Sequence, residues 1–254
     1  MSLTVYRYDG SFEGLLSAFA AALLEQAAAP EFCPPEGDRA GLLFGAREVP
    51  TRQGAATELL CHLQTAGGEA APRTLAMAYL AELPDHELAM YEYCQLTLDR
   101  HECIDGWAAH PAVARVGDDA RRVSRELHRF KGLLRFMETT DGVYYAPYEP
   151  DHNITVPLAR YFAERLGGQP WIIHDRRRGL AVLWDGHSLQ PGKVPTPAAS
   201  GMASEPALSA GEETVQSQWR TYHRQIAIAS RANPRLQRQC MPRRYWRYLV
   251  EMQG

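Results

Sequence analysis

Several features that define common protein classes are missing from this 254-residue sequence. No apolar run approaches the roughly 20 residues that a membrane-spanning helix needs, so we expect no membrane partner. The first residues lack the basic-then-apolar pattern of a signal peptide, which predicts a cytoplasmic protein. The cysteines number five and are widely scattered, which favours reduced thiols over a disulfide framework.

Common catalytic and metal-binding motifs are missing as well. The chain has no Gly-rich phosphate loop, no Gly-x-Ser-x-Gly elbow and no His-Glu-x-x-His pair. Its neighbouring Cys and His residues lack paired Cys-x-x-Cys knuckles, and no close cysteine triplet could hold an iron–sulfur cluster. We therefore expect no metal and no cofactor, and the sequence leaves open whether the protein is an enzyme.

Lysine is also scarce, and the charges are unevenly distributed. Residues 1–114 carry 6 Arg and no Lys against 16 acidic residues, a formal charge of −10. Residues 115–254 carry 21 basic against 14 acidic residues, a formal charge of +7, with arginines interleaved among aromatics. We predict an acidic, mostly helical region (1–114) followed by a basic, Arg/aromatic-rich α+β module (115–254). The use of 25 Arg against 2 Lys is also consistent with a genome's compositional habit.

The hydrophobic periodicity predicts a helix-dominated α+β fold with a small antiparallel sheet. Its strands are expected at 143–148, 171–175 and 180–184, the last two joined as a hairpin whose tip carries three arginines. Proline and small residues over 188–211 predict a flexible loop. Helices are expected from residue 11, and over 55–66, 73–83, 85–104, 117–138, 155–166 and 212–231.

Arginines and aromatics in the basic half are the candidate nucleic-acid-binding residues. Guanidinium groups dock phosphate, and aromatic faces stack on bases. If folding gathers these side chains on one surface, they form a phosphate-binding track. If it does not, they are solvated helix faces or dock onto acidic protein surface. The candidates are Arg121, Arg125, Arg129, Arg135, Tyr144, Tyr145, His152, Arg176, Arg177, Arg178, Arg220, Arg235, Arg243, Arg244 and Trp246.

The segment Tyr144–Asn153 contains two prolines, which fix the backbone, and it presents tyrosines and His152 together at a strand end. Rigid aromatic walls with a polar reader suit a pocket that stacks a base. Equally, the segment could be a proline-bracketed turn whose tyrosines fill the core. His152 and Asp175 are weak catalytic candidates. His174 and Asp175 are adjacent in a strand and should point to opposite faces, so we do not expect them to act on one another.

The order of motifs in the second half resembles a bacterial family described as DNA metabolism or DNA repair proteins. The residues that carry the resemblance are Phe130–Phe136, Gly142–Ile154, Trp171–Arg176, Leu183–Gly186, Trp219–His223, Asn233–Leu236 and Met241–Trp246. The C-terminal module is similar to one fused to some uracil-DNA-glycosylase-like domains. Members of the family that lack this fusion have an N-terminal region that begins much like residues 8–16 here. They are typically encoded beside a radical-SAM protein, so the resemblance implies such a protein as partner. The family supplies no established reaction.

Three hypotheses follow. The first is a DNA-binding accessory to a radical-SAM DNA modification or repair enzyme. The second is a DNA-acting enzyme of the glycosylase-like hydrolase type that uses His152 or Asp175. The third is a scaffold whose basic half docks an acidic protein.

Overall fold

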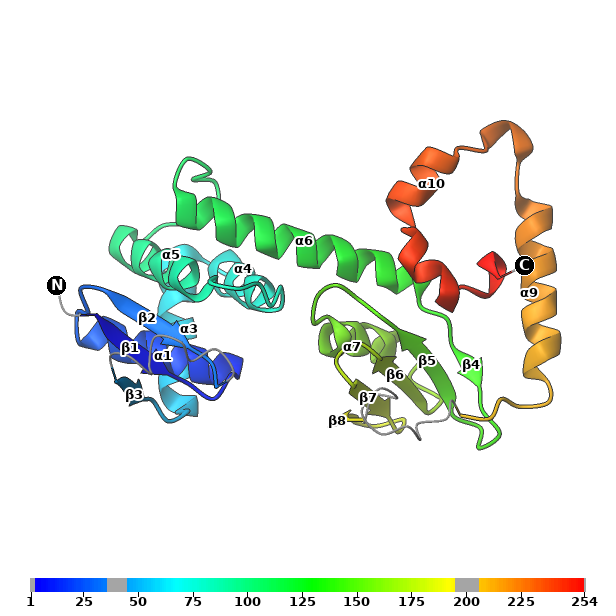
Figure 1. The fold of residues 1–254 in the computed structure, drawn as a ribbon, viewed down its shortest axis with the longest axis horizontal. Helices are drawn as coiled ribbons and strands as arrows, with labels where there is room; N and C mark the ends of the chain where they lie inside the picture. Colours follow the sequence, from blue (N-terminus) through cyan, green and yellow to red (C-terminus); the bar gives the residue numbers. More distant parts are fainter. Residues whose placement is uncertain (1–2, 36–44, 195–205, 254) are drawn as a thin grey trace. The chain divides into compact units, whose positions relative to one another are not determined.

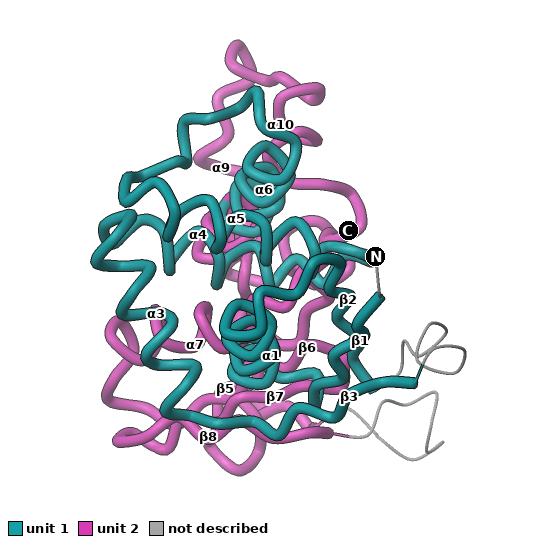
Figure 2. The backbone as a smooth tube through the Cα atoms, turned by 90° about the vertical axis from the view of Figure 1, so that its left-hand side faces the viewer, with its two compact units in different colours: residues 1–124 teal, residues 125–254 magenta. Residues whose placement is uncertain are grey.

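The computed structural model describes residues 3–35, 45–194 and 206–253. The chain divides into two compact units, residues 1–124 and 125–254 (Figure 2). The boundary predicted after Ala114 falls inside helix α6 (Pro111–Leu133), which continues across the division. The structure is 52% helix and 15% strand, which confirms the helix-dominated α+β class.

Unit 1 contains a three-stranded sheet in the order β2-β1-β3, and all of its pairings are parallel. The strands are β1 (Thr4–Arg7), β2 (Pro30–Cys33) and β3 (Ala46–Glu48). Helix α1 (Phe12–Leu24) connects the first two strands and begins at Ser11, whose hydroxyl accepts the Gly14 N–H. The sequence also predicts a short strand within residues 41–49; β3 is that strand, although residues 41–44 lie outside the described ranges.

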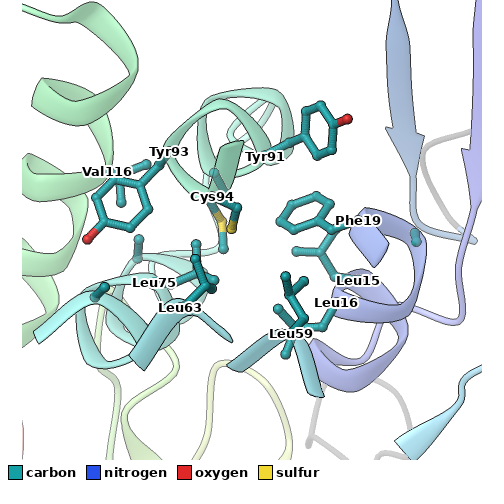
Figure 3. Close-up of a cluster of buried hydrophobic side chains, with 14 of the residues drawn as sticks. Leu15, Leu16, Phe19, Leu59, Leu63, Leu75, Tyr91, Tyr93, Cys94 and Val116 are labelled. Atoms are coloured by element: carbon teal, nitrogen blue, oxygen red, sulfur yellow. The ribbon is translucent and has the colours of Figure 1, made fainter. Parts of the chain in front are cut away.

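Within the described residues of unit 1, three further helices pack together with the first half of α6. They are α3 (Gln53–Gly67), α4 (Ala70–Tyr79) and α5 (Glu87–Arg100). Apolar side chains of these helices point toward one another and toward α1 (Figure 3). Leu15, Leu63 and Leu75 are completely buried there, as is the Cys94 thiol. Burial of this apolar area is the main source of the unit's stability.

Unit 2 is built on a five-stranded sheet in the order β4-β5-β6-β7-β8 (Figure 1). Its strands are β4 (Met137–Glu138), β5 (Tyr144–Tyr148), β6 (Trp171–Asp175), β7 (Leu180–Trp184) and β8 (Leu189–Lys193). The expected hairpin is confirmed, because β6 and β7 pair antiparallel around a turn at residues 176–179. The sheet is mixed, however, since β5 and β6 run parallel.

The parallel pairing has a structural cause. Helix α7 (Thr155–Arg165) lies between β5 and β6 in the sequence, and such a crossover returns the chain in the same direction. Leu158, Ala159 and Phe162 form its buried face. As a result, the carboxyl ends of β5 and β6 lie side by side at one edge of the sheet.

Two predicted boundaries are corrected by the structure. The helix expected at 117–138 begins at Pro111 and ends at Leu133, because Met137 and Glu138 pair with β5. The flexible loop expected at 188–211 includes β8, which pairs along its whole length with β7. Residues 195–205 of that loop lie outside the described part of the chain.

The remainder of unit 2 is a C-terminal arm. It contains α9 (Glu212–Ile226), the 3₁₀ helix η1 (Ala229–Arg231), α10 (Pro234–Cys240), and the 3₁₀ helices η2 (Arg243–Tyr248) and η3 (Val250–Met252). Figure 1 shows the arm leaving through α9 and returning through α10, and η3 packs beside α9. The helix expected at 212–231 therefore ends at Ile226.

Candidate functional site

The carboxyl ends of β5 and β6 bring two predicted segments together. Residues 149–153 follow β5, and the arginine turn 176–178 follows β6. Ligands of parallel sheets commonly bind beyond the carboxyl ends of the strands. We call this region the β5–β6 edge, defined by residues 149–153 and 176–178.

Arg178 joins the two segments of the edge. Its Nη1 donates to Asp175 Oδ2 at 2.9 Å, and its Nη2 donates to the Asp151 carbonyl at 2.8 Å. The Asp175 carboxylate, fully buried, also accepts the backbone N–H groups of Arg177 and Arg178. Burial raises the pKa of Asp175, while the hydrogen bond and charge of Arg178 oppose that rise. Arg178 and Asp175 therefore shape the turn and are not available to a ligand.

Glu126 of α6 holds the other side of the edge. Its buried carboxylate accepts the backbone N–H groups of Asp151 and His152, each at 2.8 Å, and the Tyr245 hydroxyl at 2.6 Å. The loop after β5 and the helix η2 are thus fixed to one carboxylate. Hydrogen bonds to a charged group are stronger than neutral ones, so this anchor makes the edge rigid.

Two arginines of η2 reach the edge from the C-terminal arm. Arg244 forms an ion pair with Asp151, and Arg247 forms one with Glu149. The two arginine side chains are 52% and 57% exposed. Exposed ion pairs of this kind contribute little to stability, so a phosphate oxygen can replace the carboxylate at modest cost.

A cavity of about 370 Å³ opens beside the edge. Arginines from three parts of the chain line it: Arg135 after α6, Arg176 after β6 and Arg247 in η2. Arg135 is also held by Glu251, with Nη2 and Oε1 2.6 Å apart, and that carboxylate is 3% exposed. The cavity thus combines a fixed guanidinium with more exposed ones, a composition that suits an anionic ligand.

None of the predicted arginines outside the edge and Arg135 lines this cavity. Arg121 belongs to unit 1 and pairs with Asp118 at 2.5 Å. Arg125 and Arg129 are on the part of α6 in unit 2. Arg220 and Arg235 are on α9 and α10. Arg243 is exposed on η2, and its guanidinium stacks 5.4 Å from the centre of the Trp246 ring.

The aromatic candidates are less exposed than a base-stacking pocket requires. Tyr145 and Tyr148 are buried, and Phe130 packs against the Tyr148 ring. Tyr144 is half-buried in β5, and Trp246 is half-buried in η2. Tyr145 and Tyr148 of β5 are thus packed in the core, as the alternative of a proline-bracketed turn expects, and the stacking role of Tyr145 stays a prediction.

The catalytic candidates also have structural partners. His152 is half-buried, with its backbone N–H bound to Glu126. As the strand alternation predicts, His174 and Asp175 point to opposite faces: His174 Nδ1 lies 2.7 Å from the Tyr145 hydroxyl, whereas Asp175 binds Arg178. The His174 Nε2 atom is buried and has no hydrogen-bond partner within the described residues.

Of the carboxylates of the site, the sequence reasoning singled out only Asp175. The carboxylates that bind its arginines come from Glu149, Asp151, Asp175 and Glu251. No local pattern marks Glu251 or Glu149 as ion-pair partners. Glu126 did carry a signal, because it lies three residues after Val123 and four before Phe130, on the apolar stripe of its helix.

The described residues contain no group of three His, Cys, Asp or Glu side chains that could hold a metal ion. Within the same residues, no helix is long and apolar enough to cross a membrane.

This architecture defines an α+β protein whose second unit places an arginine-lined cavity at the carboxyl edge of a mixed sheet. The chain matches the family model DUF4130, described as a domain of unknown function, over residues 84–251. Because the match covers more than half of the chain, the protein belongs to this family. A search of curated proteins gave no match.

Proposed function

We propose that this protein binds nucleic acid at the β5–β6 edge, as an accessory to a radical-SAM enzyme that modifies or repairs DNA. The observation that carries the proposal is the meeting of arginines distant in sequence: Arg135, Arg176 and Arg247 line one cavity, and Arg244 lies beside it on Asp151. The radical-SAM partner rests on the family resemblance of the motifs.

The ion pairs of the site determine which arginines serve phosphate. Arg178 and Arg135 are bound to carboxylates that are 0% and 3% exposed, so they maintain the fold of the site. Arg244 and Arg247 pair with half-exposed carboxylates and can exchange them for phosphate oxygens. Binding of this kind releases counterions from the nucleic acid, and its affinity falls steeply with salt.

Fluorescence anisotropy with labelled single-stranded and double-stranded oligonucleotides tests the proposal. The full chain is titrated at a low and a near-physiological salt concentration. The double variant Arg244→Gln/Arg247→Gln should bind more weakly, with a salt dependence reduced by about one phosphate contact for each arginine removed. Arg160→Gln/Arg165→Gln is the matched control, because it removes the same charge from exposed positions on α7.

A wild-type chain with no measurable affinity for either oligonucleotide at low salt would disprove the proposal. Equal losses in the two double variants would show that net charge alone governs binding. The partner is tested separately, by co-purification of the radical-SAM protein before and after nuclease treatment. Loss of the complex after nuclease treatment would assign the link to DNA and not to direct contact.

A further inference from the structure

The wall of the arginine cavity contains two glutamines that the phosphate contacts do not use. Gln216 lies on α9 and Gln253 follows η3, and both line the cavity. The C-terminal arm brings them to one site, because η3 packs beside α9. A side-chain amide offers a ligand either a donor nitrogen or an acceptor oxygen, so its orientation decides what the cavity recognises.

The hydrogen bonds of the two amides fix which atom is left for a ligand. Gln216 Nε2 donates to Oε1 of the buried Glu212 at 2.9 Å, and Gln253 Nε2 donates to the Arg247 carbonyl. A carboxylate and a carbonyl only accept, so a flipped amide would place two oxygens against each other. Within the described residues, neither glutamine Oε1 receives a hydrogen bond. The cavity therefore offers two acceptor oxygens.

The other walls of the cavity suit the remaining parts of a nucleotide. Arg176 and Arg247 supply guanidinium groups for a phosphate. Met137, Pro147 and Leu208 supply apolar surface, against which the faces of a base can pack. The volume of about 370 Å³ lies near the lower end of the range for small-molecule sites, which suits a single nucleotide.

Two acceptor oxygens select bases by their hydrogen-bond donors. An exocyclic amino group carries two hydrogens, so cytosine, adenine and guanine each complement the pair of glutamine oxygens. Uracil and thymine carry a carbonyl oxygen where cytosine carries its amino group, and that oxygen would face the glutamine oxygens without a hydrogen. A site built around a donor of its ligand rejects the analogue that lacks the donor, because polar groups are left unpaired.

We infer that the arginine cavity binds one nucleotide whose base carries an exocyclic amino group. Its phosphate lies on Arg176 and Arg247, and its amino group donates to the Oε1 atoms of Gln216 and Gln253. The inference rests on the proposed function, since the nucleotide belongs to the nucleic acid bound at the β5–β6 edge, and it adds that the site distinguishes bases. In a strand, the nucleotide must leave the base stack, which costs least in single-stranded nucleic acid.

Isothermal titration calorimetry of the full chain with single nucleotides tests the inference without a strand. Deoxycytidine and deoxyuridine 5′-monophosphates are close in size and differ in the group that the glutamines receive. We expect the cytidine nucleotide to bind about tenfold more tightly, the equivalent of about one hydrogen bond. Gln216→Met and Gln253→Met should each reduce this preference, and the double variant should abolish it. Gln218→Met is the matched control, because Gln218 is exposed on α9 and does not line the cavity.

A further variant separates recognition of the phosphate from recognition of the base. Arg176→Gln should weaken both nucleotides by a similar factor and leave the preference intact, because it removes a phosphate donor only. Gln253 is exposed, so Gln253→Met should fold even where Gln216→Met disturbs the start of α9.

No measurable binding of either nucleotide, equal binding of the two, or a preference that survives the double glutamine variant would each overturn the inference. The oligonucleotide titrations distinguish its failure from that of the proposed function. Strand binding together with equal affinities for the two nucleotides would overturn this inference alone. A preference between the nucleotides without strand binding would overturn the proposed function alone.

Discussion

The hydroxyl of Tyr245 donates to Oε1 of Glu126 at 2.6 Å, although the two residues are 119 positions apart in the sequence. The same carboxylate accepts the backbone N–H groups of Asp151 and His152. One buried acid thus joins α6, the loop after β5 and η2. The position of Arg244 and Arg247 at the β5–β6 edge depends on this junction, because both belong to η2.

Replacing Glu126 should strongly destabilise unit 2. Glu126→Ala leaves two partly buried N–H groups and the buried Tyr245 hydroxyl without this acceptor, and we expect a loss of about 3 kcal/mol in the free energy of unfolding. Urea unfolding followed by tryptophan fluorescence measures it, since Trp171, Trp184, Trp219 and Trp246 belong to unit 2. Tyr245→Phe removes two hydrogen bonds of the hydroxyl, the one donated to Glu126 and the one accepted from Arg244, and should cost about 1 to 2 kcal/mol. Equal stabilities of Glu126→Ala and wild type would contradict this role.

The pair formed by His174 and Tyr145 predicts a pH dependence of stability. Burial, and next the positive charge of Arg176, lower the pKa of His174 below its ordinary value. The unfolded chain therefore binds a proton more readily than the folded one. The contribution of His174 to the free energy of unfolding is complete above about pH 6.5 and is progressively lost as the pH falls below that value.

His174→Gln, which cannot titrate, tests this dependence. The free energy of unfolding of the wild type should fall more steeply between about pH 6.5 and pH 5 than that of the variant. His86 is also buried with a lowered pKa, but it is present in both proteins and cancels in the difference. Parallel pH profiles for the two proteins would show that His174 is not the titrating group.

Local patterns predicted most of the long helices of both units and missed strands in both, β2 in unit 1 and β4 and β8 in unit 2. The alternation of β6 and β7 around an arginine turn identified the hairpin, and the apolar stripe of α6 identified that helix. In unit 1, β2 was not predicted, because Pro30 and the prolines that follow it are typical of a chain break. β2 pairs with β1 through residues 4–7, and this long-range pairing leaves no local signal.

The candidate site was predictable mainly in its positive charges. Arg135 and Arg176 are among the predicted arginines and both line the cavity, whereas Arg247 was not among the candidates. Their closeness follows from the parallel pairing of β5 and β6 and from the anchor at Glu126, neither of which has a local pattern. Ion-pair partners such as Glu149 come from the fold and not from spacing, so the charges that compensate the arginines could not be foreseen.

The five thiols should differ sharply in reactivity. Cys94 is completely buried and Cys33 is buried, and burial raises the pKa of both thiols. Cys61, Cys103 and Cys240 are exposed. A thiol reagent such as DTNB should therefore titrate three cysteines rapidly in the native protein and all five in denaturant, because the thiolate is the reactive form. Rapid modification of Cys94 in the native protein, located by peptide mass mapping, would contradict the packing of the unit 1 core.

Gly14, in the first turn of α1, should not tolerate replacement, although alanine usually stabilises a helix more than glycine does. A Cβ at Gly14 would overlap the Asp9 carboxylate. That carboxylate cannot move freely, because it accepts hydrogen bonds from Ser11 and Thr51. Gly14→Ala should therefore destabilise unit 1 by about 1 to 3 kcal/mol.

Gly54 of α3 provides the matched control in the same unit. No atom lies within 4 Å of a Cβ built there, so Gly54→Ala should stabilise the helix by about 0.5 to 1 kcal/mol. Hydrogen exchange read by mass spectrometry on peptides from residues 3–24 and 53–67 measures both changes within unit 1. If Gly14→Ala slowed exchange as Gly54→Ala does, the Asp9 network would not be the rigid element that fixes the start of α1. Gly14→Ala and Gly54→Ala are the same substitution, and we expect them to change the stability of unit 1 in opposite directions. Helix propensity alone would stabilise both helices, so the difference reports the Asp9 network.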